Sequence, residues 1–197
     1  MPVPEQPPEG ATPLAADEAA DLIPGHVRTR AQLNVWEQEN ILAATLWTQR
    51  TRSSALDERT IRELHRRMFD RTWRWAGMYR RTDKNIGVDW STIAVEVRKL
   101  IDDGGYWIRE RVYEIDESAV RLHHRLVRIH PFPDGNGRHA RLWCDLLMQQ
   151  NGRRPILWQG DQLGSAGEAR KAYISSLRAA DGGNLGPLLG LLLSGRS

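Results

Sequence analysis

The chain has 197 residues, of which 28 are Lys or Arg and 25 are Asp or Glu, so its formal net charge is +3 at pH 7. This length fits one domain with short appendages, and a hydrophobic share of 40% with eight tryptophans is sufficient for a core. No apolar run approaches the roughly 20 residues that span a bilayer, and the single cysteine, Cys144, excludes an internal disulfide and a zinc site built from cysteines.

The first part of the chain predicts an arm followed by helices. Residues 1–28 contain several prolines and acids with little periodicity, which indicates a loose arm. From Thr29, the run TRAQLNVWEQENILAATLWTQR has apolar residues at helical spacing, near one stripe. A second helix is expected in ERTIRELHRRMF, with Asp57 as its N-cap.

The segment WRWAGMYRRTDKNIGVDW differs from the helical runs around it. It has two glycines and no 3.6-residue period, so it predicts irregular chain that contains a short β-hairpin, with the turn at Asp83 to Asn85. A helix is expected to begin near Ser91. The pair Gly104-Gly105 should weaken or bend that helix before Tyr106.

The last part of the chain again predicts helices. Asp116 is expected to cap a helix that ends at His130, before Pro131. The next helix should start near Arg138 and end at Asn151-Gly152, a pair suited to a left-handed C-cap. One more helix, in AGEARKAYISSLRAADGG, precedes a leucine-rich turn. These patterns predict a mainly α domain with one hairpin.

The loop PFPDGNG between two of these helices has the residues of a phosphate site. Gly135 and Gly137 flank Asn136, and glycines allow positive φ and a close approach of the backbone to a ligand. Successive N–H groups in such a turn form a concave anion site. The N-terminus of the following helix adds further N–H donors and a positive dipole end.

Charged residues around this loop suit a polyphosphate. Arg138 and Arg141 share one face of the first helical turn, where bound phosphate would offset two positive charges. Asp134 is the natural ligand for a Mg²⁺ that accompanies such a phosphate chain, and His130 can take a proton from an attacking hydroxyl. A lone histidine is usually a cap or core residue, and glycine-rich turns are common. The coincidence of all these groups within HPFPDGNGRHAR favours an enzyme that transfers part of a nucleotide.

The segment from His130 to Arg141 resembles the Fic family. It fits the family pattern HxFx(D/E)GNGRxxR at every fixed position. Residues 29–183 resemble a Fic domain, which leaves residues 184–197 as a short C-terminal helix or tail. WAGMYRRTDKNIG is similar to the segment that leads into the family's substrate-positioning hairpin, the flap, and the flanks are most similar to the subgroup called mobile mystery protein B.

The resemblance implies a helical bundle with a β-hairpin flap beside the active loop. It implies that AMP moves from ATP to a Ser, Thr or Tyr hydroxyl of a target protein, with ATP and Mg²⁺ required. His130 would be the general base and Asp134 the Mg²⁺ ligand. The residues that would hold the phosphates are Gly135, Asn136, Gly137, Arg138 and Arg141. The flap that would pair with the target as an added strand comprises Thr82, Asp83, Lys84, Asn85, Ile86, Gly87 and Val88.

Several alternatives stay open. The Doc branch of the family, which includes toxins, transfers phosphate and usually has Ala and Lys where this chain has Gly135 and Gly137, so the glycines favour nucleotidyl transfer. Another nucleotide donor is a further alternative. The alternative without catalysis is a nucleotide-binding or nucleic-acid-binding module, but the basic residues are scattered among acids and no specific nucleic-acid partner is expected.

Partners and location follow from the same considerations. The subgroup implies a small regulatory or DNA-binding partner protein in addition to the target. No signal peptide opens the chain and no membrane association is expected, so the default location is the cytoplasm.

The resemblance also raises the question of an inhibitory helix. Many Fic proteins carry (S/T)xxxE(G/N), whose glutamate pairs with the second arginine of the motif. Glu39-Asn40 matches the end of this pattern, with Val35 where Ser or Thr is expected, and Glu37 is a competing choice. The hypothesis is that Glu39 reaches Arg141 in the resting state. The alternative is a solvated helix face.

Overall fold

The computed structural model describes residues 14–27, 29–158 and 167–194. The named elements in these ranges are all helical, which confirms the mainly α prediction. In chain order they are α1 (Ala16–Ala20), α2 (Arg30–Thr48), α3 (Glu58–Phe69), the short 3₁₀ helix η1 (Trp90–Thr92), α4 (Ile93–Arg109), α5 (Ile115–Ile129), α6 (Asn136–Gln150), α7 (Glu168–Asp181) and α8 (Gly186–Leu193).

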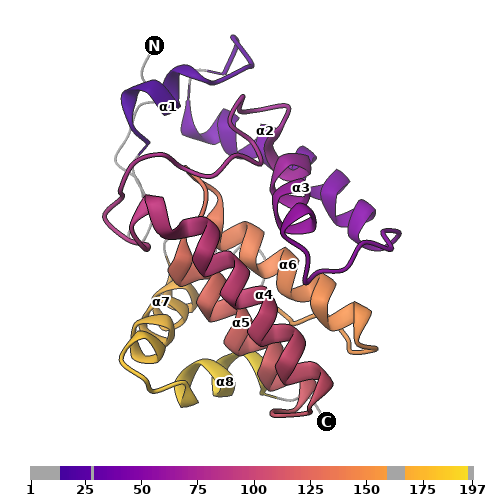
Figure 1. Cartoon of the computed structure of the whole chain (residues 1–197). Helices are drawn as coiled ribbons and strands as arrows, with labels where there is room; N and C mark the ends of the chain where they lie inside the picture. The colour runs from indigo at the N-terminus through magenta and orange to yellow at the C-terminus, as the bar shows by residue number, and fades with distance from the viewer. Residues whose placement is uncertain (1–13, 28, 159–166, 195–197) are drawn as a thin grey trace.

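Helices α4, α5 and α6 lie side by side in the middle of the molecule (Figure 1). Helix α5 contacts α4, α6, α7 and α8, whereas α2 packs on α3 and α3 reaches α6. The fully buried large side chains of the core include Trp73, Trp143, Phe69 and Phe132. The α5–α6 connection therefore lies where the α2–α3 pair meets the central helices.

The predicted starts of the first two long helices are confirmed. Thr29 caps α2, because its hydroxyl accepts a hydrogen bond from the Gln32 N–H while the Gln32 side chain accepts from the Thr29 N–H, each at 3.2 Å. Asp57 caps α3 and accepts from the Arg59 N–H at 2.8 Å. In both cases a local side-chain signal was enough to place the boundary.

The glycine pair in α4, which was expected to weaken or bend the helix, does not interrupt it. Helix α4 continues through Gly104 and Gly105 to Arg109. Gly104 is buried, and a Cβ atom there would lie 3.0 Å from methyl groups of both Leu122 and Leu56. Glycine lowers helix stability, but at position 104 the absence of a side chain allows α4 to pack closely on α5.

Asp116 is not the N-cap of α5. The N-cap is Glu114, which makes no side-chain capping bond, and Asp116 lies inside the first turn. Its carboxylate forms an ion pair with Arg153 at 2.5 Å, beyond the end of α6. At this same C-terminal end of α6, Gly152 has φ +72°, in agreement with the predicted left-handed C-cap.

The predicted β-hairpin is absent from residues 77–89, a second correction. These residues form an irregular loop without strands, here called the flap loop. The buried Arg80 explains why: its Nε donates to the His130 carbonyl at 2.8 Å, Nη1 to the Thr82 carbonyl at 2.8 Å, and Nη2 to the Val88 carbonyl. One guanidinium thus satisfies the Thr82 and Val88 carbonyls, which a hairpin would pair with backbone N–H groups, and also the His130 carbonyl.

The expectation of a loose N-terminal arm does not hold for residues 14–27. The Ile23 N–H donates to the Thr72 carbonyl at 2.9 Å, and the Trp75 indole donates to the Glu18 carbonyl at 3.0 Å. This segment is therefore docked at the base of the flap loop. Residues 1–13 and 28 lie outside the described residues.

The C-terminal part contains α7 and α8, which contact each other, and both also contact α5. The predicted leucine-rich turn is helix α8, with Leu188 and Leu192 buried. Across the ranges that the structure describes, no helix is both long and apolar enough to cross a bilayer.

Candidate active site

The chain turns sharply between α5 and α6. His130, just after α5, is left-handed with φ 54° and ψ 59°, and Gly135, the N-cap of α6, is left-handed with φ 76°. A Cβ atom at position 135 would lie 2.5 Å from the Phe69 ring, so only glycine fits there. A left-handed conformation is uncommon for a residue with a side chain. Its occurrence at His130 shows that the loop, here called the motif loop (residues 130–135), is held in a specific shape.

Asn136 fixes this shape from inside. Its Oδ1 accepts from the Phe132 N–H at 2.9 Å and its Nδ2 donates to the Phe132 carbonyl at 2.8 Å, while the residue is 3% exposed. The side chain of Asn136 is therefore used for the loop itself. Asn136 was expected to bind phosphate, and with its side chain occupied, the group that can do so is its backbone N–H.

The N-terminus of α6 faces the motif loop. The first N–H groups of a helix have no partner within the helix and carry the positive end of its dipole. Gly137 lies among them, and a Cβ atom there would meet only Arg141 Nη1, at 3.8 Å. The open space at Gly137, beside donors that need an acceptor, suits an anion.

Arg138 meets a buried carboxylate from a distant helix. Its Nη1 lies 2.5 Å from Oε2 of Glu37, which is 2% exposed on α2, and its Nη2 lies 4.0 Å from Asp134. Glu37 also accepts from the Trp73 indole at 2.8 Å. Burial disfavours the charged form of Arg138, but Glu37 and Asp134 outweigh it, so the pKa of the guanidinium is raised.

Arg141 has a different environment. It lies one turn further along α6, and its guanidinium carbon is 6.0 Å from the ring centroid of Tyr173 on α7. Burial lowers the pKa of Arg141; the Tyr173 hydroxyl counteracts this, and the charges of Arg138 and Arg170 add to it. Among the described residues, the group that counteracts the effect of burial on the pKa of Arg141 is the Tyr173 hydroxyl, and no carboxylate there forms an ion pair with Arg141.

His130 is a neutral imidazole at neutral pH. The residue is 7% exposed, and burial followed by the charges of Arg80 and Lys84 lowers its pKa to about 4. A histidine in this state can accept a proton, as a general base must.

The flap loop lies directly against His130. Gly87 has φ +107°, and a Cβ atom there would lie 2.8 Å from the His130 Cβ and 2.7 Å from Arg80 Nη2. The loop is joined to α1 by an ion pair between Lys84 and Glu18, whose side chains are 5% and 11% exposed. Gly87 of the predicted flap therefore lies against His130, although in a loop and not in a hairpin.

Glu39 does not reach Arg141 in the structure. It is exposed on α2, whereas the carboxylate that meets the arginines of the motif is Glu37, on Arg138. The reason is helical register: the buried face of α2 contains Leu33, Glu37, Asn40 and Ala44. This spacing of four, three and four residues is a signal that the sequence carried.

Sequence reasoning missed other residues that build the site. Three of these residues are the histidines His65, His123 and His124, which are all buried. His65 lies between the flap loop and the motif loop, and His123 Nε2 is 2.8 Å from the Tyr173 hydroxyl. No local pattern marks these contacts, because each joins segments that are far apart in the chain.

Asp134 is the residue that fits a divalent cation. Its side chain is 17% exposed, and its carboxylate lies beside the α6 N-terminus. Among the described residues no cluster of three or more His, Cys, Asp or Glu side chains exists that could enclose a metal. One carboxylate with phosphate and water oxygens is a typical Mg²⁺ environment, so the donor set fits a cation that arrives with a nucleotide.

The comparisons with known proteins agree with this geometry. A family model described as "Fic/DOC family" matches residues 55–148, which span α3 to most of α6. The chain therefore contains a Fic/DOC family domain. The matched range includes the flap loop and the whole motif from His130 to Arg141.

Relatives of this Fic domain are named adenylyltransferases. Protein adenylyltransferase fic-1 of Caenorhabditis elegans is 33% identical over 137 residues, which are 66% of this chain and 25% of that protein. The chain thus spans about a quarter of the length of the curated relatives it matches.

Solved structures show the same fold. Fic-1 (residues 134–508) of C. elegans has a TM-score of 0.65 and 27% identity, and covers 88% of this chain and 51% of that one. BepC of Bartonella tribocorum, solved with bound AMPPNP, has a TM-score of 0.68 and 18% identity, and covers 90% and 96%.

Proposed function

We propose that this Fic domain transfers AMP from ATP to a hydroxyl side chain of a target protein. The observation that carries the proposal is the placement of a neutral, buried His130 beside an α6 N-terminus that holds two arginines. The names of the curated relatives support the same reaction. ATP is favoured as the donor by those names and by the AMPPNP bound to the B. tribocorum protein.

ATP would lie with its phosphates over the N-terminus of α6. The N–H groups at Gly135 to Arg138 would take the inner phosphates, and the guanidinium groups of Arg138 and Arg141 the outer ones. Asp134 would hold Mg²⁺, which neutralises charge that develops on the leaving pyrophosphate. Gly137 supports nucleotidyl transfer over the phosphate transfer of the Doc branch, because its open side leaves room for a phosphate where that branch has a lysine.

The proposed step is an in-line displacement at the α-phosphorus. The target hydroxyl gives its proton to the His130 imidazole while its oxygen forms a bond to the α-phosphorus. The bond between the α-phosphorus and the bridging oxygen breaks, and pyrophosphate leaves. His130 is deprotonated before the step, and nearby phosphates raise its pKa toward the range of an efficient base.

Glu37, and not Glu39, is the residue that we propose as the brake. Its carboxylate occupies the Arg138 guanidinium at 2.5 Å, where an outer phosphate would bind. The family pattern pairs the inhibitory glutamate with the second arginine of the motif, whereas here the pair involves the first. The resting chain would then bind ATP weakly or in an unproductive pose until Glu37 is displaced.

The flap loop, residues 82–88 above all, would position the target. Its backbone lies against His130 through Gly87, so a peptide that pairs with it would place a Ser, Thr or Tyr hydroxyl beside the base. A small regulatory partner protein would act by releasing Glu37.

Intact-mass spectrometry tests this function. The purified chain is incubated with ATP and Mg²⁺ in four forms: wild type, Glu37→Gln, Glu39→Gln and His130→Ala combined with Glu37→Gln. Glu37→Gln keeps an acceptor for the Trp73 indole and removes the negative charge that faces Arg138. The exposed Glu39 is the matched control. We expect self-labelling by one AMP mass, increased by Glu37→Gln only and lost with His130→Ala. An added phosphate mass would overturn the proposed reaction.

A further inference from the structure

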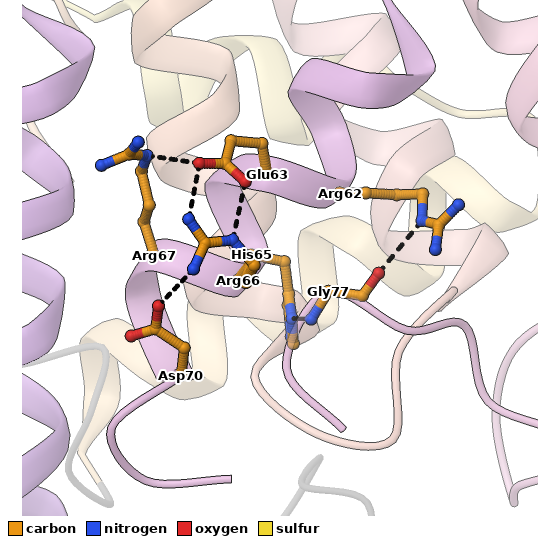
Figure 2. A network of polar contacts seen from close by, with 7 residues as sticks. All are labelled: Arg62, Glu63, His65, Arg66, Arg67, Asp70 and Gly77. Carbon is orange, nitrogen blue, oxygen red and sulfur yellow. Dashed lines mark hydrogen bonds and ion pairs between the residues drawn. The ribbon is translucent and has the colours of Figure 1, made fainter. Parts of the chain in front are cut away.

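His65 on α3 joins the two loops of the site. The Gly77 N–H, at the start of the flap loop, donates to Nδ1 of His65 at 3.0 Å (Figure 2). On the other side of the ring, Nε2 lies 3.1 Å from the carbonyl oxygen of Asp134 in the motif loop. The side chain is fully buried. One imidazole therefore bridges segments that are more than fifty residues apart in the chain.

These contacts determine the tautomer of the ring. Since Nδ1 accepts a hydrogen bond from a backbone N–H, it carries no proton, so the proton of the neutral ring is on Nε2. Nε2 therefore donates to the Asp134 carbonyl. The ring is also stacked on Phe132, with 3.7 Å between ring centroids and an angle of 17° between the planes. Both ring nitrogens are hydrogen-bonded to the backbone, so His65 can affect the site only by positioning Gly77 and Asp134.

The bond to Asp134 sets the direction of a phosphate donor. The peptide between Asp134 and Gly135 is planar and trans, so its N–H points opposite to its C=O. With the carbonyl held toward α3 by His65, the Gly135 N–H points away from α3. Donation to the carbonyl also polarises the peptide and strengthens its N–H as a donor. Gly135 is the N-cap of α6, so this N–H belongs to the proposed phosphate site.

The bond to Gly77 fixes the flap loop to the same helix. Arg62 Nε donates to the Gly77 carbonyl at 3.1 Å, so α3 holds both sides of this residue (Figure 2). Gly77 has φ +78°, and a Cβ atom there would lie 2.9 Å from the Arg62 carbonyl oxygen. Helix α3 therefore contacts both the start of the flap loop and the motif loop, and it is their common support.

We propose that His65 is a positioning residue for nucleotide binding: its Nε2–H orients the Asp134–Gly135 peptide so that the Gly135 N–H faces a phosphate. The proposal rests on the proposed function in one respect, that the ligand of the motif loop is a nucleotide. The bond to Gly77 would hold the ring in place and keep the flap loop in register with the phosphate site.

Two substitutions separate the two bonds. His65→Gln places an amide N–H near the position of Nε2 and keeps a donor for Asp134, whereas His65→Asn places an amide oxygen near Nδ1 and keeps only the acceptor for Gly77. Both remove the imidazole from the stack on Phe132, so loss of packing is common to them. A merely structural role for His65 predicts similar effects of both variants.

The experiment measures the affinity of the full chain for AMP-PNP with Mg²⁺ by calorimetry, with Glu37→Gln present in every protein. The ¹H–¹⁵N signal of Gly135 is recorded without nucleotide. We expect His65→Asn to weaken binding by roughly tenfold or more, the effect of one misplaced donor to a charged acceptor, and to shift the Gly135 signal. His65→Gln should stay within roughly threefold of the parent and show little shift.

Equal affinities of the folded Asn and Gln variants would overturn the proposal. Should the Asn variant not fold, the Gln variant decides alone: affinity near that of the parent supports the role of the donor, and a large loss contradicts it. The proposed reaction fails separately. A parent chain that binds AMP-PNP with this dependence on residue 65 but transfers no AMP would refute adenylyl transfer and leave the role of His65 standing.

Discussion

Replacement of Glu37 by Gln should lower the stability of the chain and at the same time increase its affinity for ATP. Glu37 is 2% exposed, and its Oε2 lies 2.5 Å from Arg138 Nη1. At an effective dielectric constant of about 20, opposite charges roughly 4 Å apart attract each other by about 4 kcal/mol. Desolvation of both groups offsets much of this. We therefore estimate a net coupling of about 1–3 kcal/mol.

In the proposed mechanism ATP and Glu37 compete for the Arg138 guanidinium, so this coupling would be lost when an outer phosphate binds there. Without it, ATP should bind about 5-fold to 150-fold more tightly, because about 1.4 kcal/mol corresponds to a factor of ten. The free energy of unfolding should fall by about 1–3 kcal/mol, since Arg138 loses its buried partner. The Trp73 indole keeps its acceptor in the amide, which limits the loss.

Calorimetric titration with ATP and urea denaturation measure the two effects in the same protein. Glu39→Gln is the control and should change neither quantity, because Glu39 is exposed. An unchanged affinity for ATP in folded Glu37→Gln, or an equal gain in Glu39→Gln, would refute the reasoning that Glu37 blocks the phosphate site.

Three further outcomes follow from the site. Gly135→Ala should cost about 1–3 kcal/mol of stability in denaturant melts, because its Cβ would lie 2.5 Å from a phenyl ring at φ +76°, whereas Gly137→Ala should cost about 1 kcal/mol or less; similar losses would contradict the fit at Gly135. His130 and His139 have pKa values lowered to about 4, so the unfolded chain binds more protons between pH 4 and 6.5. The contribution of these two histidines to the free energy of unfolding should be fully present above about pH 6.5. It should fall by up to about 1.4 kcal/mol per histidine for each pH unit below that value. A urea midpoint that does not change over this range would contradict the lowered pKa values. Glu18→Gln removes the carboxylate that the flap-loop lysine contacts and should raise amide hydrogen exchange in residues 82–88 with little change in α6; unchanged exchange would show that α1 does not restrain the loop.

The parts of the fold that local chemistry determines could be predicted from the sequence. Thr29 and Asp57 act as caps within three residues of themselves, so their helix starts were visible without a structure. The motif from His130 to Arg141 is equally local, because a helix end, a turn and a helix start are all read from adjacent residues. The structure confirms the helix end at His130 and places the next helix start at Asn136, two residues before the predicted Arg138.

Features that depend on contacts between distant segments could not be predicted in this way. A hairpin was expected at residues 82–88, but the buried Arg80 binds the carbonyls of its own loop and of His130. Nothing near Arg80 in the sequence shows that it is buried. The arm was read as loose from its composition, although Glu18 contacts the flap loop across more than sixty residues.

The choice between Glu37 and Glu39 lies between these cases. Glu39 was chosen because Glu39-Asn40 matches the end of the family pattern, whereas the buried face of α2 contains Leu33, Glu37, Asn40 and Ala44. A short sequence pattern does not show which face of a helix is buried. Polar residues occupy half of this buried face, so Glu37 could not be recognised as buried from its hydrophobicity.

The central claim, that His130 catalyses transfer of AMP, is tested most directly by following two labels of ATP. The Glu37→Gln chain is incubated with Mg²⁺ and ATP labelled with ³²P at either the α- or the γ-phosphorus, beside the same chain with His130→Ala. We expect the protein to retain the α label and not the γ label, and His130→Ala to abolish retention without preventing ATP binding. Retention of the γ label, or of the α label in the His130→Ala chain, would contradict this claim.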